Sequence, residues 1–175
     1  MRFKGEDIKR FIPQRNPMMM VDVLQTQDDG SATTVLAVRP DNMFMLPDGT
    51  LAETGLIEHI AQSASALASF TQQTHPQPLP VREGSDYTQG GEGDNSTAEH
   101  STPLPHREGP GVGLPPIGLI GEVKHFTCHR RPQSGDRIET TIVFGFTFGN
   151  ATIVTGTCRI SGEVVAEAKM KIFIQ

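Results

Sequence analysis

Residues 50–70 read TLAETGLIEHIAQSASALASF, a stretch with helical periodicity and very few charges. Thr50 and Glu53 match a capping box, in which a hydroxyl and a carboxylate bond the free amides of the first turn, so we predict a helix that begins near Thr50. Thr54 is an alternative first residue. Small or apolar side chains occur on every side of 56–70, which is typical of a buried helix. Because small side chains allow close approach, we predict a central helix wrapped by a sheet.

The residues before this helix predict a hairpin. Two extended runs, 18–24 and 32–38, are separated by the turn-like residues 27–31. A short helical stretch at 5–12 precedes them and is stopped by Pro13. The first block of the chain therefore contributes two antiparallel strands before the central helix.

The last block of the chain is rich in strands. Alternate residues from 138 to 148 share one face of a predicted strand: Ile138, Thr140, Ile142, Phe144, Phe146 and Phe148. Gly-Asn at 149–150 and Gly162 mark turns, and two further strands follow at 151–161 and 164–174. Consecutive strands with short turns form an antiparallel meander. We therefore predict an α+β fold.

Length and composition limit the possible functions. The chain has 175 residues, which favours a single domain, 1–175. The net charge is −5 and no run of Lys or Arg exceeds two residues, so we expect no nucleic-acid partner. No apolar run approaches the ~20 residues of a membrane-spanning helix, and the N-terminus lacks the apolar core of a secretory signal. Two cysteines are too few for a disulfide framework. We expect a cytoplasmic protein with no membrane partner.

Residues 75–116 differ from the rest of the chain. They hold eight of the 13 prolines and seven of the 18 glycines, and the sequence PLPVREG at 78–84 returns as PLPHREG at 103–109. Such a composition buries too little apolar surface to offset the entropy of ordering, so we predict a poorly ordered insertion between the helix and the later strands. The near-repeat indicates a mobile sequence element translated in frame. A Pro-rich docking segment for a partner is the alternative.

The central helix carries one polar stripe at intervals of three and four residues: Thr54, Glu58, Gln62, Ser65 and Ser69. One interpretation is that this stripe faces water. However, Glu58 is the only Asp, Glu, Lys or Arg between Glu53 and Arg82, whereas a solvated helix face normally carries several. A lone carboxylate on a small, uncharged helix indicates a partly buried group suited to general acid–base chemistry.

The histidines are weaker candidates. His59 lies about 100° round the helix from Glu58, so we interpret it as a surface or interface residue. His125, Cys128 and His129 have the residue types of a metal site. On a strand, however, the two histidines would stand about 13 Å apart and Cys128 would point the other way. We therefore expect no metal site there.

Three segments resemble the hotdog-fold 3-hydroxyacyl-(acyl-carrier-protein) dehydratases. Residues 12–22, IPQRNPMMMVD, resemble the N-terminal motif of that family: Leu/Ile-Pro, His or Gln, Arg, any residue, Pro, three apolar residues, Val-Asp. Residues 55–62, GLIEHIAQ, resemble the start of its central helix, with Glu-x-x-Ala-Gln intact. Residues 126–136, FTCHRRPQSGD, are similar to its strand-and-turn segment that ends in Pro-Gly-Asp. The resemblance covers the chain apart from 75–116.

The resemblance implies a hotdog fold, in which an antiparallel sheet wraps a long helix. In this family a helix Glu and a loop His remove water from a 3-hydroxyacyl thioester, while an N–H at the helix start polarises the thioester carbonyl. Carried over, Glu58 is the catalytic residue, the Gly55 amide is the carbonyl donor, and Gln62 and Thr54 bind substrate. The resemblance also implies a substrate carried by acyl carrier protein or CoA, in fatty-acid or polyene-type biosynthesis. It implies no cofactor or metal, and either a homodimer or a hetero-oligomer with another hotdog subunit.

The chain departs from the family at the loop His. That His lies in a Gly-His-Phe-Pro segment before the helix, whereas residues 42–50 read NMFMLPDGT. Asp-Gly followed by Gly-x-x-Glu resembles a divergent branch associated with aryl-polyene-type pigment clusters. Asp48 is a candidate catalytic replacement for the missing group, and Asn42 is another. Two alternatives remain open: a hotdog thioesterase whose carboxylate activates water, and a non-catalytic partner subunit of a complete dehydratase.

Overall fold

The computed structural model of the chain describes residues 1–26, 32–74 and 118–174. The predicted turn at 27–31 and the predicted insertion at 75–116 lie outside these residues. The elements in chain order are β1 (Arg2–Lys4), the short 3-10 helix η1 (Gly5–Arg10), β2 (Val23–Thr26), β3 (Ala32–Ala37), α1 (Glu53–Thr74), β4 (Gly118–Cys128), β5 (Arg137–Phe148), β6 (Ala151–Ile160) and β7 (Glu163–Ile174).

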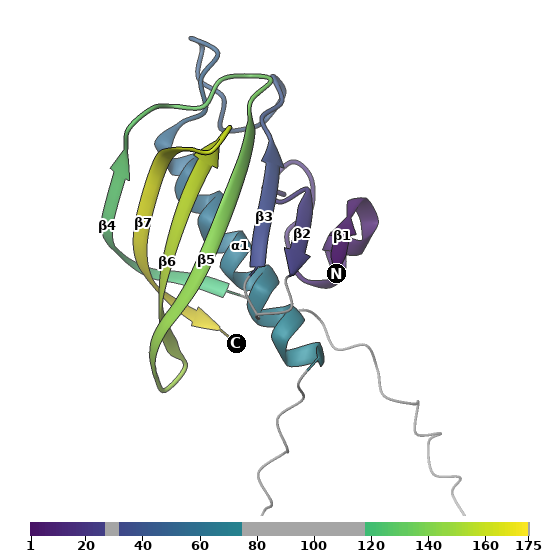
Figure 1. Cartoon of the computed structure of the whole chain (residues 1–175), viewed down its shortest axis with the longest axis vertical. Helices are drawn as coiled ribbons and strands as arrows, with labels where there is room; N and C mark the ends of the chain where they lie inside the picture. The colour runs from purple at the N-terminus through teal and green to yellow at the C-terminus, as the bar shows by residue number, and fades with distance from the viewer. Residues whose placement is uncertain (27–31, 75–117, 175) are drawn as a thin grey trace, which may run out of the picture. The chain divides into compact units, whose positions relative to one another are not determined.

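The described strands form one antiparallel sheet in the order β1-β2-β3-β5-β6-β7-β4. β4 forms one edge of the sheet, and β5 lies in the middle beside β3. β5, β6 and β7 follow one another as antiparallel hairpins, and β7 also pairs with β4. α1 lies along one face of the sheet and packs against every strand from β2 to β7 (Figure 1). The α+β prediction with a central helix is confirmed.

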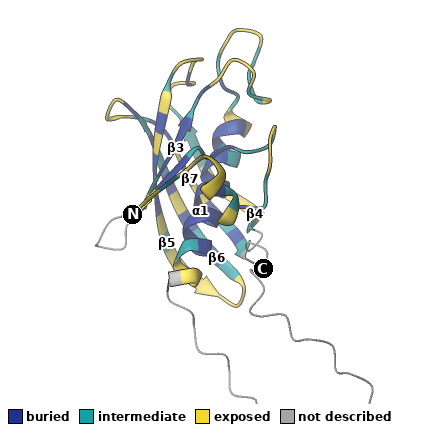
Figure 2. Ribbon diagram, turned by 90° about the vertical axis from the view of Figure 1, so that its right-hand side faces the viewer, coloured by how far each residue is buried: buried dark blue, intermediate teal, exposed yellow. Residues whose placement is uncertain are grey.

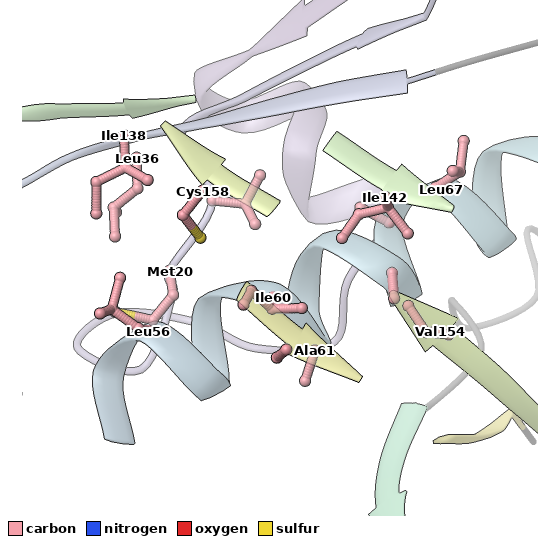
Figure 3. Close-up of a cluster of buried hydrophobic side chains, with 14 of the residues drawn as sticks. Met20, Leu36, Leu56, Ile60, Ala61, Leu67, Ile138, Ile142, Val154 and Cys158 are labelled. Carbon is pink, nitrogen blue, oxygen red and sulfur yellow. The ribbon is translucent and has the colours of Figure 1, made fainter. Parts of the chain in front are cut away.

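The middle of α1 is buried because the sheet curves round it. Every residue from 59 to 69 is buried, and Figure 2 shows buried residues gathered on the helix and on the strands beside it. The labelled centre of the core in Figure 3 joins helix side chains to those of the strands and of the segment before β2: Met20, Leu36, Leu56, Ile60, Ala61, Leu67, Ile138, Ile142, Val154 and Cys158. Burying an aliphatic side chain of Val or Leu size contributes about 1.5–3 kcal/mol, so this cluster is the main source of stability.

β6 approaches the helix closely at Gly156. A Cβ there would overlap Ile60 Cγ2 and lie 3.3 Å from Ile142 Cδ1. We expect Gly156→Ala to lower the free energy of unfolding by about 1–3 kcal/mol, the usual cost of overpacking a core. Urea denaturation measures the loss. The double variant with Ile60→Ala should lose less than the sum of the two single losses, because the clash is then relieved. Strict additivity would contradict this close approach.

The predicted hairpin is present, but its first strand is shorter than expected. β2 begins at Val23 and pairs with β3, for example Leu24 with Thr34. Met18 and Met20 are not part of a strand because their backbone groups bond side chains of α1. The helical stretch predicted at 5–12 is the 3-10 helix η1.

A bulge in β5 changes the face of its last side chains. The predicted face is turned to the core up to Phe144, but Phe146 and Phe148 are 75% and 80% exposed. The pairing of β5 with β6 shifts by one residue between Phe144 and Thr147. Because side chains alternate with period two, one extra residue moves those that follow it to the other face. The prediction is therefore wrong for Phe146 and Phe148.

Candidate functional site

The start of α1 is organised by an aspartate turn. The helix begins at Glu53, and Asp48 Oδ1 accepts hydrogen bonds from the Thr50 hydroxyl at 2.6 Å and the Thr50 N–H at 3.0 Å. The capping-box prediction is wrong because this nearer carboxylate takes the Thr50 hydroxyl. The Thr50 hydroxyl, followed by the Thr50 N–H, also lowers the pKa of the exposed Asp48 carboxyl. A carboxyl held in its ionised form in this way is a poor proton donor.

Gly55 is buried in the first turn of the helix, where the absence of a side chain is required. A Cβ there would lie 2.7 Å from Phe44 Cβ, so the preceding loop packs directly on the helix. The Gly55 N–H donates to Ala52 O at 3.0 Å, which gives the predicted carbonyl donor an internal acceptor. Among the described residues, the amides of Glu53 and Thr54 have no acceptor. These two N–H groups are the unused donors at the positive end of the helix, and sequence reasoning missed them.

Gln62 links the helix to the segment before β2. Its side chain is buried, with 1% of the residue exposed. The Oε1 atom accepts from the Met20 N–H at 2.7 Å, and Nε2 donates to Met18 O and to Glu58 Oε1, each at 2.7 Å. Both hydrogens of the amide are therefore used. Gln62 fixes one oxygen of the Glu58 carboxylate relative to the backbone of residues 18–20.

The polar stripe of α1 is turned mainly into the protein. Gln62, Ser65 and Ser69 are buried, whereas Glu58 is half-buried and Thr54 is exposed. The interpretation that the stripe faces water is therefore wrong for Gln62, Ser65 and Ser69. The stripe reaches solvent only at its N-terminal end, where the carboxylate of Glu58 lies.

Neither candidate for the missing loop His is joined to this carboxylate. Asn42 Oδ1 accepts from the Phe44 N–H at 2.9 Å, and Asn42 Nδ2 lies 3.2 Å from Met20 Sδ. Within residues 1–26, 32–74 and 118–174, no hydrogen bond or ion pair connects Asn42 or Asp48 to Glu58. Both side chains instead stabilise turns of the loop that precedes the helix.

His59 is fully buried, which corrects its interpretation as a surface or interface residue. Its Nδ1 lies 2.6 Å from Met20 O and its Nε2 lies 2.8 Å from Thr140 Oγ1. Thr140 Oγ1 is in turn 3.1 Å from the buried thiol of Cys158. Burial lowers the pKa of His59 to about 4. The ring is neutral at neutral pH and is shielded from any substrate.

A cavity of about 460 Å³ lies beside the segment before β2. It is lined by Gly5, Glu6, Lys9, Asn16, Pro17, Met19, Asp22, Arg39, Asp41 and Asn42. Its two lining cations pair with lining carboxylates, Lys9 with Glu6 and Arg39 with Asp22. Neither Glu58 nor Gln62 is among the lining residues, so this cavity is not built round the candidate carboxylate.

The histidines near the end of β4 make separate contacts. His125 Nε2 lies 3.0 Å from Thr127 Oγ1, and His129 Nε2 lies 3.7 Å from Glu167 Oε2. In the part of the chain that the structure describes, no group of three or more potential metal ligands comes together. None of the helices in these same ranges has the length and apolarity that crossing a bilayer requires.

Comparison with known families identifies the first half of the chain. Residues 6–84 match the model of the ApeP-like family, described as ApeP dehydratase. This match includes the Pro-Gln-Arg motif, the loop with Asp48, and the helix with Glu58 and Gln62. No curated protein matches the sequence.

Solved structures match nearly the whole chain at low identity. The dehydratase heterocomplex ApeI:P from Xenorhabdus doucetiae has a TM-score of 0.67 at 12% identity, over 96% of this chain and 90% of that one. Protein PH1136 from Pyrococcus horikoshii, described as uncharacterized, has a TM-score of 0.56 at 12% identity, over 99% and 95%. The PaaI protein of the phenylacetic acid degradation operon of E. coli has a TM-score of 0.51 at 9% identity, over 86% and 80%. These structures share the helix-in-sheet fold described above.

Proposed function

Since residues 6–84 match the ApeP-like dehydratase family, we propose that the chain is a hotdog-fold dehydratase-family protein that takes part in the dehydration of 3-hydroxyacyl thioesters, with Glu58 as its acid–base residue. In this reaction the C2 proton is removed, the C3–O bond breaks, and the hydroxyl leaves with a proton as water. A double bond forms between C2 and C3. A carrier-protein or CoA thioester is the proposed substrate, in fatty-acid or polyene-type biosynthesis.

The environment of Glu58 carries this proposal. The carboxylate is half-buried, Gln62 holds Oε1 at 2.7 Å, and Oε2 has no hydrogen-bond partner among the described residues. One oxygen is thus oriented and the other is available for proton transfer. The unused amides of Glu53 and Thr54 lie at the start of the same helix. There the partial positive charge of the helix favours a thioester oxygen that gains negative charge in the transition state.

The elimination requires a second group, because one residue takes the C2 proton and another assists the hydroxyl. His59 is neutral and buried, and Asp48 is held in its ionised form by Thr50. We therefore propose that a second hotdog subunit supplies the group that the loop before α1 lacks. The match to a structure of a dehydratase heterocomplex supports such an assembly.

Mass spectrometry of a 3-hydroxyacyl carrier-protein thioester tests this function. We expect loss of water when the chain is co-purified with a hotdog subunit that has the Gly-His-Phe-Pro segment, and little or none with either subunit alone. Release of free thiol instead would assign a thioesterase. Equal dehydration by the partner alone and by the complex would assign this chain a non-catalytic role.

A further inference from the structure

The residue next to Glu58 points into the core and contacts the same segment as Gln62. His59 Nδ1 lies 2.6 Å from the carbonyl oxygen of Met20, while the N–H of Met20 donates to Gln62 Oε1 at 2.7 Å. One peptide segment is therefore held from both sides by two residues of α1. Neither contact depends on a strand, because β2 begins only at Val23.

The hydrogen-bond partners of the neutral ring determine its tautomer. Met20 O can only accept, so the single ring hydrogen lies on Nδ1. Nε2 then carries no hydrogen and lies 2.8 Å from Thr140 Oγ1. The Thr140 hydroxyl also contacts the Cys158 sulfur, at 3.1 Å. The ring is therefore held between Met20 O and Thr140 Oγ1, with its hydrogen directed to Met20 O.

This chain of contacts continues to the carboxylate. Gln62 Nε2 donates to Met18 O and to Glu58 Oε1, so the orientation of the amide depends on where residues 18–20 lie. Asn42 Nδ2 also contacts Met20, but only through its thioether sulfur, a weak acceptor. The contact to Met20 O, in contrast, comes from the buried ring of His59.

We propose that His59 is a positioning residue for Glu58, acting through the carbonyl of Met20 and the side chain of Gln62. This inference rests on the proposed role of Glu58 as the acid–base residue. Without the His59 contact, residues 18–20 are held less firmly and Gln62 no longer fixes Oε1. Since misplacement of a reacting group by about 1 Å costs up to 10²-fold in rate, the effect should fall on kcat more than on KM.

Two polar variants separate positioning from simple loss of core packing. His59→Asn places an amide N–H near the position of Nδ1 and keeps a donor for Met20 O. His59→Gln places its amide near the position of Nε2, toward Thr140, and loses the Met20 contact. We expect kcat of the Asn variant to stay within about threefold of the parent and that of the Gln variant to fall about 10–100-fold, with KM changed less than threefold. Equal kcat losses, or losses that follow the melting temperature, would overturn the inference.

Hydrogen exchange at the Met20 amide provides a readout that needs no activity. We expect protection of this amide to persist in His59→Asn and to fall at least tenfold in His59→Gln, because Gln62 loses its fixed partner. Equal protection in both variants would overturn the inference even if dehydration is observed. If the unsubstituted complex shows no dehydration while the two variants differ in exchange, the proposed function fails and the His59–Met20–Gln62 link stands.

Discussion

Replacing Glu58 with Gln should lower kcat for dehydration by about 10²–10⁴-fold, the contribution of one positioned acid–base group. The substitution is isosteric, and its side-chain oxygen can still accept the hydrogen bond that Gln62 Nε2 now donates at 2.7 Å. The fold and the position of the side chain are therefore kept, and only proton transfer is removed. KM should change less than about threefold because the carboxylate acts mainly in the transition state.

A matched control is available five residues earlier in the same helix. Glu53 is exposed and pairs with Arg131 at 3.3 Å, at the rim of the helix start. Glu53→Gln removes the same charge and is expected to leave kcat within about twofold of the parent, because exposed ion pairs contribute little. Full dehydration by Glu58→Gln, or an equal loss in both variants, would contradict a specific role for Glu58.

The stability of the protein should fall as the pH is lowered from 7 to 4. Burial lowers the pKa of His59 from 6.5 to about 4. Between these values the unfolded chain binds a proton that the folded chain does not, so the contribution is complete above pH 6.5 and is lost toward pH 4. This difference between the unfolded and folded pKa values of His59 corresponds to about 3 kcal/mol of the free energy of unfolding. Urea denaturation at several pH values measures it.

Variants isolate the histidine from the carboxylates, which also titrate in acid. The difference in unfolding free energy between the parent and His59→Asn should shrink by about 3 kcal/mol from pH 7 to pH 4. His129 is half-exposed, and its nearest acidic partner, Glu167, is 3.7 Å away. His129→Asn is the matched control, because this ring lies outside the buried core. A His59→Asn curve parallel to the parent would show that burial of this ring does not couple folding to protonation.

The main elements could be predicted from the sequence because their patterns are local. The composition of 56–70 distinguishes a buried helix from a surface helix. The Gly-containing turn at 161–162 ends one strand of the meander and begins the next: both Ser161 and Gly162 have positive φ, 51° and 86°. Glu58 could be identified as a candidate because it is the one charged residue among small residues, and the sequence alone shows this.

The contacts that organise the site could not be predicted in this way. His59 is buried because residues 39 and 81 positions away supply partners for its two nitrogens. A helical wheel shows only that His59 lies on a different face from Glu58. It gives no information about hydrogen-bond partners that are distant in the sequence. The first residues of 18–24 do not form a strand for a similar reason. Their backbone groups bond the side chain of Gln62, which is far away in the sequence.

The register of β5 shows a second kind of limit. Alternation from Ile138 to Phe148 is unbroken in the sequence, yet one residue is added opposite β6 after Phe144. Gly145 stands at this point, and a Gly inside a strand pattern is compatible with a bulge without requiring one. Pairing between two strands, rather than the pattern of one, determines which face Phe146 takes.

The reactivity of the buried Cys158 thiol can report how often the core opens. Burial raises its pKa to about 11, whereas Cys128 is only partly buried. Because the thiolate is the reacting form, an alkylating reagent labels Cys158 only when β6 separates from the helix. The rate at which this thiol is consumed therefore follows the opening equilibrium of the folded chain under native conditions. Pulse alkylation followed by mass spectrometry can rank variants by the stability of the core without a substrate, a partner subunit or a denaturant.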